Sequence, residues 1–152
     1  MSQSLAQVYL HLVFSTKNRE AWLEKSIRSD LHAYFGGICN GMDVPCLKVG
    51  GVADHVHILA RFPRTLTIAK WVEELKTGGN RWFKSHGTQN NRGQFAWQSG
   101  YGVFSVSPSH MEALLEYIEN QEEHHRSVTF QEEYRRMLEK YRISYDERYV
   151  WD

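Results

Sequence analysis

The sequence predicts an α+β fold in which strands and helices follow the order β-α-β-β-α-β, with further helices at the C-terminal end. Runs rich in β-branched and aromatic residues, typical of strands, cover 7–14, 44–49, 55–62 and 95–106. Apolar residues recur at helical spacing over 24–39, over 67–85 and again from Met111 onward. This order matches the ferredoxin-like split βαβ arrangement, an antiparallel sheet with helices on one face.

Length and composition predict a single domain over residues 1–152, with a C-terminal helix and tail over 128–152. A chain of 152 residues can bury about two-thirds of its unfolded surface in one core. The tail begins at Thr129-Phe-Gln-Glu132, which has the form of a capping box, and apolar residues follow it at helical spacing. The strands 44–49 and 55–62 should form a hairpin around Gly50-Gly51.

One helix carries a conflicting signal. Gly78 and Gly79 fall inside the helical pattern of 67–85, and each glycine costs about 1 kcal/mol relative to alanine in a helix interior. We therefore expect a bend or a break at this point.

Several features predict a cytoplasmic protein with no membrane association. The N-terminal residues lack a basic stretch followed by an apolar one, and no apolar run approaches the length that spans a bilayer. The two cysteines, Cys39 and Cys46, fit reduced and packed thiols better than a disulfide framework.

Charge is distributed unevenly along the chain. The formal net charge is zero, but residues 1–94 contain 12 Lys and Arg against 7 Asp and Glu, whereas residues 95–152 contain 6 against 11. Such a chain can present a basic face without a basic isoelectric point. A nucleic-acid partner is therefore compatible with the composition.

The run Asp54-His55-Val56-His57 predicts half of a metal site. In a strand, side chains alternate between faces, so His55 and His57 project on one side with their Cα atoms about 6.6 Å apart. Two imidazoles at this spacing can share one ion. The alternative is two half-buried histidines that hydrogen-bond to their neighbours.

The helix that begins at Met111 carries the second half of the pattern. A helical wheel separates four glutamates on one shoulder of the apolar stripe from Tyr117, Gln121 and His124 on the other. This separation predicts that the strip around Tyr117 is free of negative charge, which suits a polyanion. The alternative is an ordinary boundary between buried and solvated residues.

Together, the two imidazoles and the Gln121 amide oxygen make three ligands, which leaves positions for phosphate oxygens. Nitrogen and oxygen ligands without thiolate favour one divalent Mg²⁺ or Mn²⁺ over structural zinc.

The sequence resembles the single-tyrosine HUH transposases of bacterial insertion sequences over nearly its whole length. Five motifs carry the resemblance in the family's order: Phe14-Ser-Thr-Lys-Asn-Arg19, His55-Val-His57, Trp97-Gln-Ser-Gly-Tyr-Gly-Val-Phe-Ser105, Tyr117-Ile-Glu-Asn-Gln121-Glu-Glu-His-His125 and Asp146-Glu-Arg-Tyr-Val-Trp-Asp152. The stretch Thr77-Gly78-Gly79-Asn80 departs from the more helix-compatible sequence expected there.

The resemblance implies a ferredoxin-like endonuclease and strand transferase that acts on single-stranded DNA with terminal hairpins. Tyr117 would attack the scissile phosphate and form a 5′-phosphotyrosine, while His55, His57 and Gln121 hold the metal ion. The family usually forms a homodimer, and we expect the tyrosine helix to act in trans, at the metal site of the partner subunit.

For DNA binding, basic residues of the N-terminal part are candidates for phosphate contacts, and a tryptophan is a candidate for base stacking. The candidates are Lys17, Arg19, Lys76, Arg81, Trp82 and His124. For each, plain surface or core packing is the structural alternative, and His124 is also a candidate proton acceptor for Tyr117.

Two other function classes remain open at this point. One is a non-catalytic or domesticated protein that binds single-stranded DNA hairpins on the same fold. The other is a small-molecule metallohydrolase, which would use the histidines but would give Tyr117 no clear role.

Overall fold

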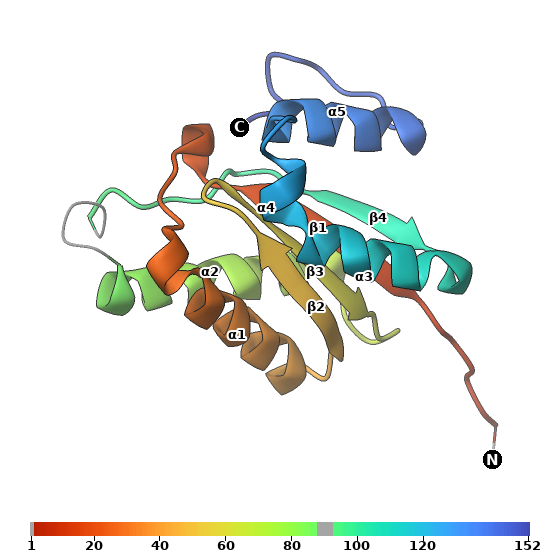
Figure 1. Ribbon diagram of the computed structural model, residues 1–152. Coiled ribbons are helices and arrows are strands. Elements are labelled where there is room, and N and C mark those ends of the chain that lie inside the picture. The colour runs from red at the N-terminus through yellow and green to blue at the C-terminus, as the bar shows by residue number, and fades with distance from the viewer. Residues whose placement is uncertain (1, 88–92) are drawn as a thin grey trace.

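A computed structural model describes residues 2–87 and 93–152 of the chain. Its four strands form one antiparallel sheet in the order β2-β3-β1-β4 (Figure 1). The strands are β1 (Tyr9–Ser15), β2 (Cys46–Gly51), β3 (His55–Arg61) and β4 (Gly102–Val106). The predicted α+β class is confirmed, and β2 and β3 pair as the predicted hairpin.

Helices cover both faces of this sheet (Figure 1). On one face, α1 (Lys25–Gly41) and α2 (Ile68–His86) pack against side chains such as Leu12, Phe14 and Ile58, which form the main core. The other face carries the C-terminal helices α3 (Met111–Glu119), α4 (Gln121–His124) and α5 (Phe130–Lys140). Two single turns of 3₁₀ helix, η1 (Lys17–Arg19) and η2 (Pro108–His110), complete the described structure.

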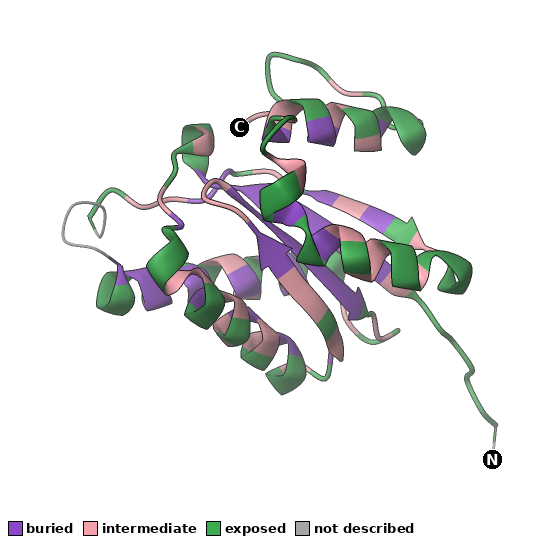
Figure 2. Cartoon of the chain, viewed as in Figure 1, coloured by how far each residue is buried: buried purple, intermediate pink, exposed green. Residues whose placement is uncertain are grey.

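Strand alternation separates the two faces. Leu10, Leu12 and Phe14 of β1 enter the main core, while His11 and Val13 point to the face under the C-terminal helices. The strands are largely buried, whereas the outer sides of the helices are exposed (Figure 2). In the described ranges, no helix is long and apolar enough to cross a membrane.

The expected bend at Gly78 and Gly79 is wrong, because α2 is one helix from Ile68 to His86. Both glycines are buried where other elements approach closely. A Cβ atom on Gly79 would lie 3.0 Å from the Trp97 ring, and one on Gly78 would collide with the Ile38 side chain of α1. Close packing thus offsets the free-energy cost of the low helix propensity of these glycines.

The fourth strand is shorter than the predicted 95–106. Trp97 forms only an isolated bridge with Thr16, and the regular strand starts at Gly102. Between them, the carbonyl groups of Gln98, Ser99 and Gly100 accept hydrogen bonds from the Lys76 side chain instead of from a neighbouring strand.

The helix that begins at Met111 is also divided. Asn120, with φ −95° and ψ 26°, separates α3 from the short α4. The capping box at Thr129 and Glu132 is present and starts α5 as predicted. The loop between α4 and α5 brings α5 back over the sheet face that carries the histidines.

Candidate metal centre and tyrosine site

The histidines of β3 lie fully buried beneath the C-terminal helices. His55 and His57 both have an exposed fraction of 0 %, and their ring centroids are 5.0 Å apart. Each directs its Nε2 atom toward the same carboxylate oxygen, Glu133 Oε1, at 3.3 Å from His55 and 3.0 Å from His57. The predicted projection of both imidazoles on one face is confirmed.

Each of these histidines is oriented from behind by a partner at Nδ1. Asp54 Oδ1 lies 2.7 Å from His55 Nδ1, and His11 Nε2 lies 2.8 Å from His57 Nδ1. Partners at Nδ1 fix the ring and leave Nε2 for a metal ion, as in most protein sites with histidine ligands. His11 is buried on β1, and its role was not foreseen from the sequence.

Gln121 reaches the same point from α4. Its side-chain oxygen lies 3.1 Å from His55 Nε2, and its amide nitrogen donates to the Tyr117 carbonyl at 3.2 Å. The side chain is 1 % exposed. The structure therefore brings together the three predicted ligands His55, His57 and Gln121.

Tyr117 lies at the edge of this cluster. Its ring packs edge-on against His57 with centroids 5.8 Å apart, and its hydroxyl lies 3.3 Å from His124 Nε2. The hydroxyl donates a hydrogen bond to Glu133 Oε2. Tyr117 and these histidines belong to the same chain, so the single chain has the cis arrangement of tyrosine and histidine cluster.

Glu133 of α5 is the principal residue that sequence reasoning missed. Its carboxylate is 3 % exposed and contacts Tyr117, Gln121 and four histidines. The glutamates on the helix of Tyr117 are exposed, but the predicted absence of negative charge from the tyrosine strip is wrong, because α5 places the Glu133 carboxylate there. A signal was available: Glu133 falls between Phe130 and Tyr134 on the apolar face of its helix.

Burial and hydrogen bonding set the protonation states of the site. Burial opposes ionisation of Glu133, but hydrogen bonds from His125, His55 and His57 hold its pKa well below the usual range. Burial, then the nearby Glu133 charge, raise the pKa of Tyr117 above its ordinary value. At rest, the carboxylate is therefore ionised and the phenol is protonated.

The two strand histidines differ in charge. Burial would lower the pKa of His55, but hydrogen bonds to Asp54 and Glu133 raise it to about 9. For His57 burial prevails and its pKa is lowered. The result is one imidazolium and one neutral imidazole against the same carboxylate.

The described residues include four whose ligand atoms all lie within 4.8 Å of one another, namely His55, His57, His125 and Glu133. Three imidazoles and a carboxylate form a donor set that suits a divalent metal ion. Gln121 lies within the same cluster, so the residues present fit a metal site of nitrogen and oxygen ligands.

The proposed DNA contacts are placed less uniformly. Lys17 and Arg81 are exposed, while Arg19 lies over the Trp151 ring at 5.6 Å. Lys76 is tied to the backbone carbonyls of residues 98–100. Trp82 is 6 % exposed and stacks on His86, so its larger part belongs to the core.

Comparison with known proteins shows the family of this chain. Residues 4–121 match the family model described as "Transposase IS200 like". The chain belongs to this family. The matched segment includes β1, the histidines of β3, Tyr117 and Gln121, whereas His124, His125 and Glu133 of this transposase lie beyond it.

Two solved structures share the fold. One is a "putative transposase" from Deinococcus radiodurans R1, with a TM-score of 0.59 and 24 % identity, over 80 % of this chain and 98 % of that chain. The other is a REP-associated tyrosine transposase bound to a REP hairpin, with a TM-score of 0.60 and 13 % identity, over 84 % of this chain and 76 % of that one. No curated protein matches the chain.

Proposed function

We propose that this protein is a metal-dependent single-stranded DNA endonuclease and strand transferase that acts at hairpin-bearing element ends in DNA transposition. The observation that carries the proposal is the meeting of Tyr117 with His55, His57 and Gln121 at one buried point. The solved relative that binds a REP hairpin supports hairpin DNA as the substrate class.

In the proposed reaction, the Tyr117 oxygen attacks the scissile phosphorus and the bond from phosphorus to the 3′ oxygen breaks. The 3′ oxygen takes up a proton, and a 5′-phosphotyrosine remains on the protein. Attack by another 3′-hydroxyl on this ester releases Tyr117 and joins two strands. The linkage conserves the energy of the original phosphodiester.

The phenol must lose its proton in this step. Glu133 is a poor acceptor, because hydrogen bonds from the histidines keep its pKa very low even though burial opposes this. His124 is better suited, since its Nε2 lies 3.3 Å from the phenol oxygen. Burial lowers its pKa, which keeps the imidazole neutral and therefore able to accept a proton. We infer that neutral His124 receives the proton.

The metal ion, Mg²⁺ or Mn²⁺, would be held by the Nε2 atoms of His55 and His57, with Gln121, Glu133 and His125 within reach. When bound, such an ion supplies Lewis-acid polarisation of a phosphate oxygen. Asp54 and His11 orient the two imidazoles for it.

A covalent adduct tests the function directly. Incubation with a hairpin-bearing single-stranded DNA and Mn²⁺, followed by denaturing electrophoresis, should give a protein-DNA band. Tyr117→Phe should abolish this band while DNA affinity stays within about twofold, because only the phenol oxygen is lost. DNA binding without an adduct in the wild type would indicate a non-catalytic hairpin-binding protein instead.

A further inference from the structure

A cavity of about 700 Å³ lies beside Tyr117 on the side away from β2. Residues of β4, α3 and α5 line most of it, and both Tyr117 and Glu133 are among them. Cavities of this size accommodate ordinary small ligands. Its walls include Leu114 and Met137, so it combines apolar surface with direct access to the nucleophile.

Arg136 supplies a positive charge at this cavity. In residues 2–87 and 93–152, no hydrogen bond or ion pair engages its guanidinium group. Burial and Glu133 raise the pKa of Tyr117, and the charge of Arg136 acts in the opposite direction. The charge of the guanidinium group therefore acts on the Tyr117 phenol. Its N–H groups are available to donate hydrogen bonds to a phosphate oxygen.

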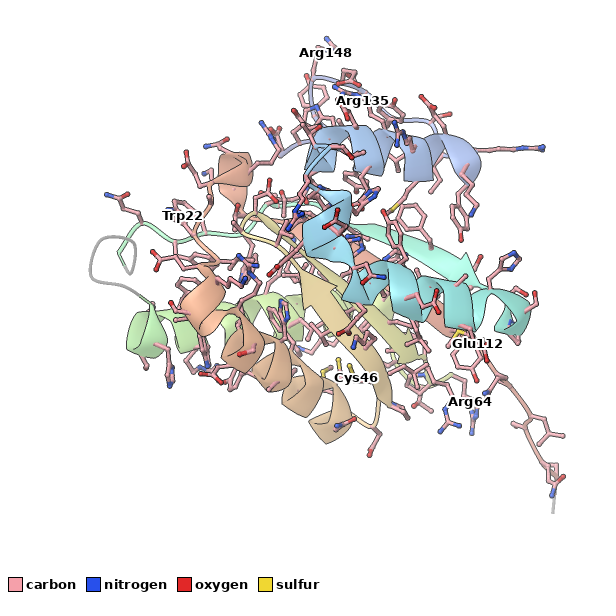
Figure 3. All side chains as sticks on the ribbon, in the orientation of Figure 1. Trp22, Cys46, Arg64, Glu112, Arg135 and Arg148 are labelled. Atoms are coloured by element: carbon pink, nitrogen blue, oxygen red, sulfur yellow. The ribbon has the colours of Figure 1, made fainter. Side chains whose placement is uncertain are left out.

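Its neighbour Arg135 is engaged quite differently. Arg135 donates hydrogen bonds to Glu147 at 2.6 and 3.0 Å and lies over the Trp151 ring at 4.9 Å. It lies on the side of α5 away from the sheet (Figure 3). Of these two adjacent arginines, Arg136 thus lies at the cavity, while Arg135 is held in an ion pair with Glu147. Arg135 can therefore serve as the control for Arg136.

Tyr141 gives the cavity an aromatic wall. Its hydroxyl donates to the Ser105 carbonyl at 2.7 Å, and its ring packs against Phe104 with centroids 4.9 Å apart. The side chain is nevertheless 38 % exposed. Lys140 Nζ lies over this ring at 6.0 Å, at the end of a flexible side chain. An aromatic ring that is held in place and partly exposed is suited to stack on a nucleobase.

Among the described residues that line this cavity, Glu133 is the one carboxylate. Its two oxygens are directed toward the imidazoles of four histidines. The cations that remain at the cavity are Arg136 and the exposed Lys140. A ligand with an anionic group and a flat apolar group matches this lining best.

We propose that the cavity binds one nucleotide of the DNA, next to the scissile phosphate, with Arg136 on a phosphate oxygen and Tyr141 against the base. This inference rests on the function proposed above. It means that the protein itself reads or holds one unstacked base beside the cleavage point.

The test uses the full chain with a cleavable hairpin oligonucleotide and Mn²⁺. Once the cleavage point is mapped, each flanking nucleotide is replaced in turn by an abasic residue, and the rate of adduct formation is measured. An abasic residue at one of these positions should slow adduct formation by the wild-type protein about tenfold. This factor corresponds to the loss of one base stack. This sensitivity should disappear in Tyr141→Leu and persist in Tyr141→Phe, which keeps the ring.

Binding gives a second readout that is independent of cleavage. In a Tyr117→Phe background, Arg136→Ala should weaken DNA binding and reduce the slope of log affinity against log salt by about 1, as expected for one lost phosphate contact. Arg135→Ala removes the same charge from the same helix and should leave both quantities unchanged.

Opposite outcomes separate the two proposals. The subsite alone would be overturned if the wild type forms the adduct at the same rate with every abasic substrate. It would also be overturned if Arg136→Ala and Arg135→Ala give equal salt slopes. The absence of any adduct in the wild type would overturn the proposed function and the subsite with it.

Discussion

The hydroxyl of Tyr117 on α3 donates a hydrogen bond to the carboxylate of Glu133, sixteen residues later on α5. Through its other oxygen, Glu133 contacts His55 and His57. The C-terminal helix, which lies beyond the segment 4–121 matched by the family, thereby connects the proposed nucleophile with the proposed metal ligands.

The first prediction concerns the ligand set. His57→Ala should abolish Mn²⁺ binding and cleavage, because a fully buried imidazole at the centre of the cluster is lost. Gln121→Ala should weaken binding less, since a neutral amide oxygen is the poorer ligand. Isothermal titration calorimetry with Mn²⁺ measures both, and an unchanged affinity in His57→Ala would refute the metal site.

A second prediction assigns Glu133 to the same site. Glu133→Gln keeps the shape of the side chain but removes its charge, so Mn²⁺ affinity should fall by about tenfold or more. Glu139→Gln removes an exposed charge from the same helix and is the matched control. Equal affinities in the two variants would mean that Glu133 only packs beside the site.

Metal binding should also release protons. Hydrogen bonds to Asp54 and Glu133 overcome the effect of burial and raise the pKa of His55 to about 9, so the metal-free protein holds a proton there at pH 7.5. A metal ligand must be unprotonated, so binding displaces about one proton and apparent affinity rises with pH up to about 9. Calorimetry in buffers of different ionisation enthalpy counts that proton.

The control for this prediction is Asp54→Asn. It removes the carboxylate that hydrogen-bonds His55 Nδ1, so fewer protons should be released per metal ion. Zero proton release in the wild type at pH 7.5 would contradict the charge assigned to His55.

Gly50 sets how closely the tyrosine helix approaches the sheet. A Cβ atom at Gly50 would lie 2.5 Å from the Ile118 carbonyl oxygen of α3. Gly50→Ala should therefore push α3 away, lower the free energy of unfolding by about 1–3 kcal/mol and slow adduct formation. Gly36→Ala, where nothing lies within 4 Å of the added atom, should stabilise α1 by up to about 1 kcal/mol. Chemical denaturation compares the two variants.

The last prediction concerns assembly. The single chain places Tyr117 beside its own His57, whereas the family resemblance implies a homodimer in which the tyrosine helix acts in trans. If so, mixing Tyr117→Phe with His57→Ala should restore part of the wild-type cleavage, because a heterodimer contains one intact composite site. Verified heterodimers without activity would establish the cis arrangement at that step.

Much of this protein follows from local pattern. The periods of strands and helices predict the element order, and strand alternation alone places His55 and His57 on one face. Helical spacing likewise places Tyr117 and Gln121 together. These features depend on residues only a few positions apart, so the sequence determines them directly.

Contacts between distant segments decided the rest. Gly78 and Gly79 weaken a helix considered by itself, but α1 and Trp97 pack against them so closely that α2 stays continuous. Lys76 was predicted from the sequence as a candidate for a DNA phosphate contact, but its side chain instead donates hydrogen bonds to the carbonyl groups before β4. Glu133 entered the site because α5 folds back over the sheet. Helical periodicity marks Glu133 as an acid on a buried face, but only the tertiary structure determines which groups surround its carboxylate.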